Sequence, residues 1–245
     1  MLSELIEYRD YTIEVHTDDD PMNPRKDFDP LGTMVCWHSR YDLGDEHSHG
    51  SVRDFFESLA MELKDSKGNS ILSDNQYNNI EEIEDARLGA IVSKHVVMLE
   101  LFLYDHSGIT MRTGAFSCPW DSGQVGFIYM TKEKALKEYG GKIFSKQLKT
   151  RIKTYMEGEV ETYDNFLTGN VYGYVVKDAD GEDIEDGSCW GYFGYDHKGS
   201  GLLEQAEDAI DYEIKDRKKK HYSKLKAWIK NNVPLINRIP CPVIA

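Results

Sequence analysis

The sequence of 245 residues is poor in cysteine and has no long apolar run. It holds four cysteines, none of them in a CxxC pair, which argues against a disulfide framework and for reduced intracellular thiols. No apolar run approaches the roughly 20 residues that a membrane-spanning helix needs. The first residues, MLSELIEYRDYTIEV, lack the basic and apolar regions of a secretory signal. We therefore expect a soluble protein of the cytoplasm, without contact to a membrane.

Basic residues are fewer than acidic residues. The chain has 29 Lys and Arg against 43 Asp and Glu, which gives a net charge of −14. Such a chain repels phosphate backbones on average, so direct binding of nucleic acid is not expected. Hydrophobic residues make up 40% and aromatic residues 11%, which is enough for a packed core and excludes a disordered chain.

Hydrophobic periodicity predicts strands and helices mixed along the whole chain. Helices are expected over 51–63, 74–93, 132–139, 146–168 and from about residue 200 toward residue 234. Strands are expected over 11–15, 32–38, 96–104, 109–113, 124–130, 171–177 and 188–195. Because several of these strands follow one another in hairpins, the pattern predicts an α+β fold with a mostly antiparallel sheet, flanking helices and a C-terminal helical extension.

The domain organisation predicted from this pattern has two parts. Residues 1–199 form an α+β domain that carries a helical insert at about 51–94. Residues 200–245 form a helical C-terminal extension packed on that domain.

Histidine and carboxylate side chains concentrate in the segment CWHSRYDLGDEHSHG, residues 36–50. His38, His47, His49 and Asp45 are candidate ligands of a divalent metal, because imidazole and carboxylate are typical zinc ligands. Their spacing matches no standard metal signature. The alternative is a polar loop that leaves a buried strand, with glycines at its turns.

Two further loops carry groups that could act in catalysis. Asp105 and His106 lie together in a hairpin turn, and Cys118 and Asp121 lie in the loop CPWDSG. With His38 they could form a Cys- or metal-dependent hydrolytic site if the fold brought them together. The alternative for Asp105 is an Asx-type turn in which its carboxylate binds its own backbone. No Gly-rich phosphate loop and no GxSxG motif occurs, and no cofactor is expected.

Charge is distributed unevenly along the chain. Residues 132–153 hold eight basic and two acidic residues, and residues 215–230 hold eight basic and one acidic residue. The rest of the chain therefore carries a net charge of −27. Such segregation favours a role in protein–protein contacts, although solvated helix faces held by ion pairs would give the same pattern. The candidate interaction residues are Trp120, Arg217, Lys218, Lys219, Lys220, Asp178, Asp180 and Asp183.

Five segments together resemble a family of uncharacterised proteins encoded by bacteriophages and other bacterial mobile elements. They are DPLGTMVCWHSRYDLGDEH (29–47), LYDHSGITM (103–111), CPWDSGQVGFIY (118–129), EVETYDNFLTGNVYGYVV (159–176) and SCWGYFG (188–194). The resemblance spans roughly residues 11–195 and implies provenance, not an activity. The insert at about 51–94 and the segment after residue 200 lie outside it, so a role particular to this chain is expected there.

Two hypotheses of function follow. In the first, the chain is a phage or mobile-element accessory protein that binds a bacterial host protein in the host cytoplasm and inhibits a defence effector through an acidic surface. In the second, it is a metal- or Cys-dependent hydrolase that uses the His-, Asp- and Cys-rich loops. The first is preferred, because the chain has segregated charge and no complete catalytic motif.

Overall fold

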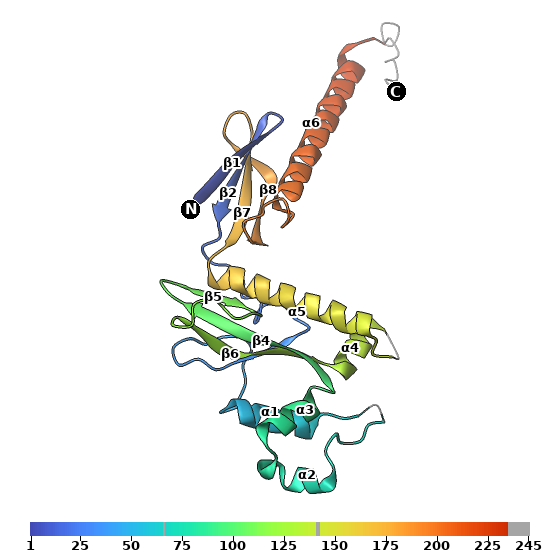
Figure 1. The fold of residues 1–245 in the computed structure, drawn as a ribbon. Coiled ribbons are helices and arrows are strands. Elements are labelled where there is room, and N and C mark those ends of the chain that lie inside the picture. Colours follow the sequence, from blue (N-terminus) through green and yellow to red (C-terminus); the bar gives the residue numbers. More distant parts are fainter. Residues whose placement is uncertain (66, 141–142, 235–245) are drawn as a thin grey trace. The chain divides into compact units, whose positions relative to one another are not determined.

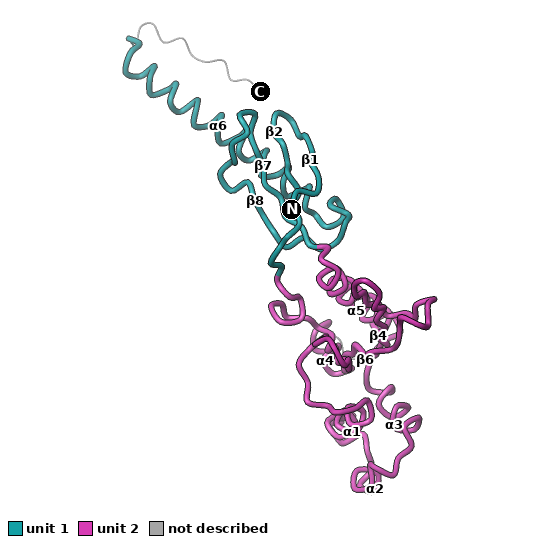
Figure 2. The backbone as a smooth tube through the Cα atoms, turned by 90° about the vertical axis from the view of Figure 1, so that its left-hand side faces the viewer, with its two compact units in different colours: residues 1–21, 171–245 teal, residues 22–170 magenta. Residues whose placement is uncertain are grey.

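The computed structural model describes residues 1–65, 67–140 and 143–234, and the chain divides into two compact units (Figure 2). The first unit comprises residues 1–21 and 171–245, and the second comprises residues 22–170. The expected boundary after residue 199 falls inside the first unit, and residues 235–245 of the expected extension lie outside the described residues. None of the helices in the described ranges is long and apolar enough to cross a membrane.

The predicted α+β class is confirmed, with strands that form two antiparallel four-stranded sheets. In the first unit the strand order is β1-β2-β7-β8. These strands are β1 (Leu2–Tyr8), β2 (Tyr11–Thr17), β7 (Val171–Lys177) and β8 (Asp183–Phe193), and the helix of this unit is α6 (Leu202–Asn232). The sheet buries one face against the first turns of α6. This small core includes Ile13, Val15, Tyr174, Val176, Leu202, Ala206 and Ile210.

In the second unit the strand order is β3-β6-β4-β5, and helices cover both faces of the sheet (Figure 1). The strands are β3 (Thr33–Cys36), β4 (Val96–Asp105), β5 (Ile109–Arg112) and β6 (Ser122–Thr131). One face packs on α4 (Lys132–Tyr139) and α5 (Lys146–Leu167), and the other on α1 (Val52–Glu62) and α3 (Asp85–Val92). These two helices and α2 (Asp74–Asn78), which has no buried residue, belong to the predicted insert. Side chains of a strand alternate between these layers. Met34 and Cys36 join the α5 core, and Val35 joins the α1 core.

Predicted helix starts are confirmed where a side chain caps the first turn. Ser51, Thr131 and Ser145 each accept a hydrogen bond from the backbone N–H three residues ahead, before α1, α4 and α5 respectively. Gly140 ends α4 in the left-handed conformation, with φ of +69°, as a C-terminal glycine does.

Two local predictions fail. The single helix expected over 74–93 is divided into α2, a 3₁₀ turn (Ile80–Glu82) and α3. Arg53 of α1 donates to the backbone carbonyls of Ile80, Glu81 and Ile83, which satisfies these groups outside a continuous helix. Strand β1 was not predicted, because its side chains are mostly exposed at the edge of the sheet and show no clear alternation.

The contact between β3 and β6 yields a stability prediction. A Cβ added at Gly126 would lie 2.0 Å from the carbonyl oxygen of Val35, whereas one at Gly123 of the same strand would meet nothing within 4 Å. We expect Gly126→Ala to lower the free energy of unfolding by about 1–3 kcal/mol, because the neighbouring backbone must move. Gly123→Ala, as the matched control, should change it by less than about 0.5 kcal/mol. Urea denaturation of both variants checks this. Equal free energies of unfolding for the two variants would show that β3 can move away from the added methyl group without loss of stability.

Candidate functional site

The predicted metal ligands of the histidine loop make contacts within the fold. Nε2 of His47 lies 2.8 Å from the carbonyl oxygen of Cys36, and its ring lies between those of Trp37 and His49, with centroids 5.2 and 5.6 Å away. The ring of His49 also contacts Phe55 of α1. These two imidazoles are therefore part of an aromatic cluster that attaches the loop to α1.

His38 is held by the backbone of the same loop. Its Nδ1 accepts hydrogen bonds from the N–H groups of Arg40 and Tyr41, both at 3.2 Å, and its ring stacks on that of Tyr41 at 4.9 Å. In the described parts of the chain no group of three or more His, Cys, Asp and Glu side chains is arranged to hold a metal ion. The loop does line an open cavity of about 670 Å³, which His38 and His47 both border.

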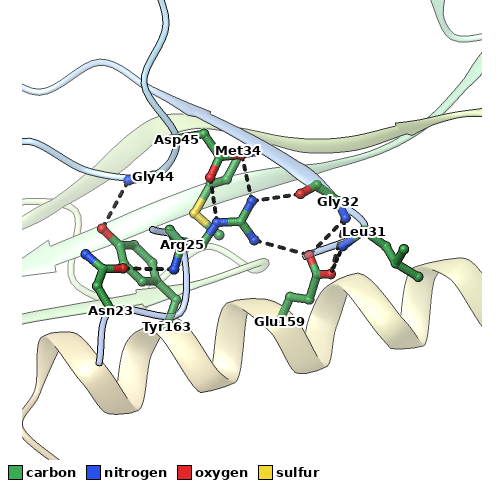
Figure 3. A network of polar contacts seen from close by, with 9 residues as sticks. All are labelled: Asn23, Arg25, Leu31, Gly32, Met34, Gly44, Asp45, Glu159 and Tyr163. Carbon is green, nitrogen blue, oxygen red and sulfur yellow. Dashed lines mark hydrogen bonds and ion pairs between the residues drawn. The ribbon is translucent and has the colours of Figure 1, made fainter. Parts of the chain in front are cut away.

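Asp45, the fourth predicted ligand, pairs with Arg25 (Figure 3). Nε and Nη2 of Arg25 donate to the two carboxylate oxygens of Asp45 at 2.8 and 2.7 Å. Asp45 also accepts from the N–H of Met34 at 2.8 Å. The Arg25 side chain is only 1% exposed, and Arg25 is the one charged residue in the buried class among the described residues.

Glu159 of α5 completes this buried network. Its carboxylate lies 3.2 Å from Nη1 of Arg25 and accepts from the N–H groups of Leu31 and Gly32. Gly32 also provides the carbonyl that accepts from Nη2 of Arg25 at 2.7 Å. A Cβ at Gly32 would lie 2.8 Å from the Glu159 carboxylate, so a side chain here would displace that carboxylate from its present contacts. The sequence offered no signal for Arg25 or Glu159, since neither lies in a motif.

The predicted catalytic residues do come close together, in two neighbouring groups at the end of the β4–β5 hairpin. The carboxylate of Asp105 accepts from Arg40 and, at 3.4 Å, from the hydroxyl of Tyr41. This takes the place of the Asx-type turn that was the alternative for Asp105. The backbone N–H of Asp105 donates to the carbonyl of Asp121 at 2.8 Å, which joins the two groups.

In the second group, Asp121 lies between the other two side chains. One carboxylate oxygen of Asp121 is 3.5 Å from Nδ1 of His106 and 3.7 Å from the thiol of Cys118. A nucleophilic cysteine needs the imidazole next to the sulfur, with the carboxylate behind it. Here the order is different, because the carboxylate contacts the thiol and the imidazole lies against the carboxylate.

Several predicted interaction residues pair with one another inside the first unit. Asp178 and Asp180 lie in the β7–β8 turn and Asp183 begins β8, and Asp178 accepts from Arg217 of α6 at 3.1 Å. This hydrogen bond is the largest cause of the lowered pKa of Asp178. Asp183 pairs with Lys177, and Lys220 pairs with Asp216. Part of the segregated charge is therefore neutralised locally, as the alternative interpretation of the charge pattern required.

Other predicted interaction residues remain on the surface. Asp180 donates its backbone N–H to Asp178 in the acidic turn, and its side chain is exposed. Lys218 and Lys219 are exposed on α6, and no ion pair of either is found within the described residues. Trp120 is 91% exposed in the loop before β6.

The C-terminal half of α6 extends past the strands of its sheet in Figure 1 and carries several exposed apolar side chains. Along its first half, Leu202, Ala206, Ile210 and Ile214 recur every four residues and pack on the sheet. The next position of this series is Lys218, and a distal row follows it, which we define as His221, Tyr222, Leu225, Trp228 and Ile229. Tyr222 is 58%, Leu225 42% and Trp228 59% exposed. Sequence periodicity predicts this row but not its exposure.

The buried network yields a second stability prediction. Arg25→Leu leaves the carboxylates of Asp45 and Glu159 without their cation, so we expect it to cost about 3–5 kcal/mol in the free energy of unfolding. Arg40→Leu is the control, because it breaks an exposed ion pair with Asp105 and should cost at most about 1 kcal/mol. Urea denaturation of the two variants measures the difference. A cost below 1 kcal/mol for Arg25→Leu would contradict a structural role of this network.

The cysteines yield a prediction about reactivity. Burial raises the pKa of Cys36 to about 12, with a further contribution from the nearby Asp45 carboxylate. At pH 8.5 roughly one Cys36 thiol in three thousand is then ionised, so iodoacetamide should leave it unmodified in the folded protein. Cys118 is partly exposed and should be modified. Peptide mass spectrometry after native and denatured labelling checks this. Equal labelling of both thiols before denaturation would contradict the buried position of Cys36.

Comparison with known proteins gives no match to this chain among family models, curated proteins or solved structures.

Proposed function

We propose that this chain is an accessory protein of a bacteriophage or mobile element that acts in the bacterial cytoplasm by binding a host protein. The observation that carries the proposal is the exposed distal row of α6. Three large apolar side chains, Tyr222, Leu225 and Trp228, follow one another at successive turns of α6, and all three are exposed. The three side chains stand at i, i+3 and i+6, and rows of apolar side chains one turn apart are how amphipathic helices bind the grooves of partner proteins.

Two observations on the sequence support the proposed provenance and target class. The five segments between residues 29 and 194 resemble proteins of phages and mobile elements. The distal row lies after residue 200, in the part that the resemblance does not cover, where a chain-specific role was expected. For a mobile element, a host defence effector is the target class that makes such binding useful, and we propose that binding inhibits it.

Capture from a host lysate tests this function. Tagged wild-type protein should retain one host protein in stoichiometric amount, and the double variant Leu225→Ala with Trp228→Ala should retain at least about thirtyfold less. The reason is that truncating central aromatic and aliphatic anchors removes most of the binding free energy. Far-UV circular dichroism and urea denaturation would establish that the variant is folded.

Two variants are matched controls for this experiment. Trp120→Ala removes an even more exposed indole outside α6, and Cys118→Ala removes the thiol of the hydrolase hypothesis. Both should capture the partner as the wild type does. Loss of capture in Trp120→Ala with retention in the α6 variant would refute the role of the distal row.

A further inference from the structure

We infer that the distal row of α6 docks into an acidic groove of the partner protein, as a helix whose apolar anchors enter the groove while lysines contact carboxylates on its rim. This inference rests on the proposed function and adds the chemistry of the partner. It draws on the placement of the anchors, on the charge around them and on the charge of the rest of the chain.

The anchors are arranged for a narrow groove. His221, Leu225 and Trp228 stand at i, i+4 and i+7, and Tyr222 and Ile229 flank them on the same side. At 1.5 Å per residue, the nine positions from 221 to 229 span about 12 Å along the helix axis. Residue 218, one turn before the row, is lysine, so the apolar surface is short and ends in positive charge.

The surroundings of the row are strongly basic. Residues 215–230 hold eight Lys and Arg and one Asp, a net charge of +7. Arg217 and Lys220 have acidic partners in the chain itself, Glu213 and Asp178 for the first and Asp216 for the second. The side chains of Lys218, Lys219, Lys224 and Lys226 are exposed around the row. Complementary charge on the partner therefore means carboxylates at the edge of the groove.

The charge of the rest of the chain favours a compact acidic groove over an extended polyanion. Outside residues 215–230 the chain carries a net charge of −21. An anionic membrane or a nucleic acid would attract the helix and repel the remainder, since both present negative charge over a wide surface. A second copy of the chain is also disfavoured, because two distal rows packed together would bring two basic segments into contact.

Site-directed photocrosslinking of the full-length protein tests the inference. Benzoylphenylalanine replaces Trp228 in one sample and Ser223, on the opposite side of the helix, in the control. After irradiation in host lysate, position 228 should crosslink one host protein and position 223 should give at least tenfold less. Mass spectrometry of the crosslinked peptide should place it in a groove lined by Asp and Glu. Benzoylphenylalanine at Tyr222 is a second reporter in case the indole of Trp228 is itself needed for binding.

Charge variants complete the experiment. One variant combines the crosslinker at position 228 with Lys218→Glu, Lys219→Glu, Lys224→Glu and Lys226→Glu. A second sample keeps these four lysines and is irradiated in 0.5 M NaCl. Each change should lower the crosslinking yield at position 228 at least tenfold. Crosslinking to a second copy, to lipid or to nucleic acid would overturn the inference.

The outcomes separate this inference from the proposed function. A specific host protein crosslinked at 228 through a groove without carboxylates, with a yield that salt does not change, would overturn the acidic groove and leave host-protein binding in place. No specific host protein in either the crosslinking or the capture experiment would overturn both.

Discussion

The buried guanidinium of Arg25 is the interaction on which the second unit depends. A charge that is removed from water must find opposite charge and hydrogen-bond acceptors, and Arg25 finds them in Asp45, Glu159 and the carbonyl of Gly32. These partners lie before β3, after β3 and on α5, so one side chain joins three segments that are far apart in the sequence. This pairing also fixes the histidine loop, because Asp45 lies within it, between His38 and His47. His47 follows Asp45 by two residues and lies against Cys36 and Trp37.

Local patterns predicted most helices and strands, because their determinants lie within a few residues. Ser145 and the apolar period that follows it were sufficient to predict α5. The turn residues between β4 and β5 were sufficient to predict their hairpin. The features that the sequence did not predict depend on contacts between residues far apart in the chain. Glu159 is 134 residues from Arg25 in the sequence, and no periodic pattern of residues predicts that the two side chains meet. Arg53 divides the helix expected over 74–93 by binding carbonyls 27 to 30 residues away. The predicted catalytic residues lie near one another, but their chemistry depends on which groups are in direct contact. In Cys118, Asp121 and His106 the carboxylate, not the imidazole, contacts the thiol.

The charge pattern contained two different features that the sequence alone could not separate. Asp178 and Arg217 belong to the acidic turn and the basic helix, and they bind each other within the first unit. That pair accounts for part of the segregated charge as internal stabilisation of the fold. The lysines at 218, 219, 224 and 226 remain exposed, around the apolar distal row. Charge that surrounds exposed apolar side chains is characteristic of binding surfaces, because the anchors supply burial and the charges supply orientation.

The lengths of the elements make this exposure unavoidable. With 31 residues, α6 is about 46 Å long, whereas the seven-residue strands β2 and β7 span about 23 Å and the eleven-residue β8 about 36 Å. A helix that begins packing at Leu202 must therefore extend past its sheet. The apolar period nevertheless continues through Leu225 and Trp228, where the sheet offers nothing to cover it. Apolar burial has no directional preference, so the apolar positions before Lys218 serve an internal contact in the first half of α6 and, we propose, those after it serve an external contact in the second.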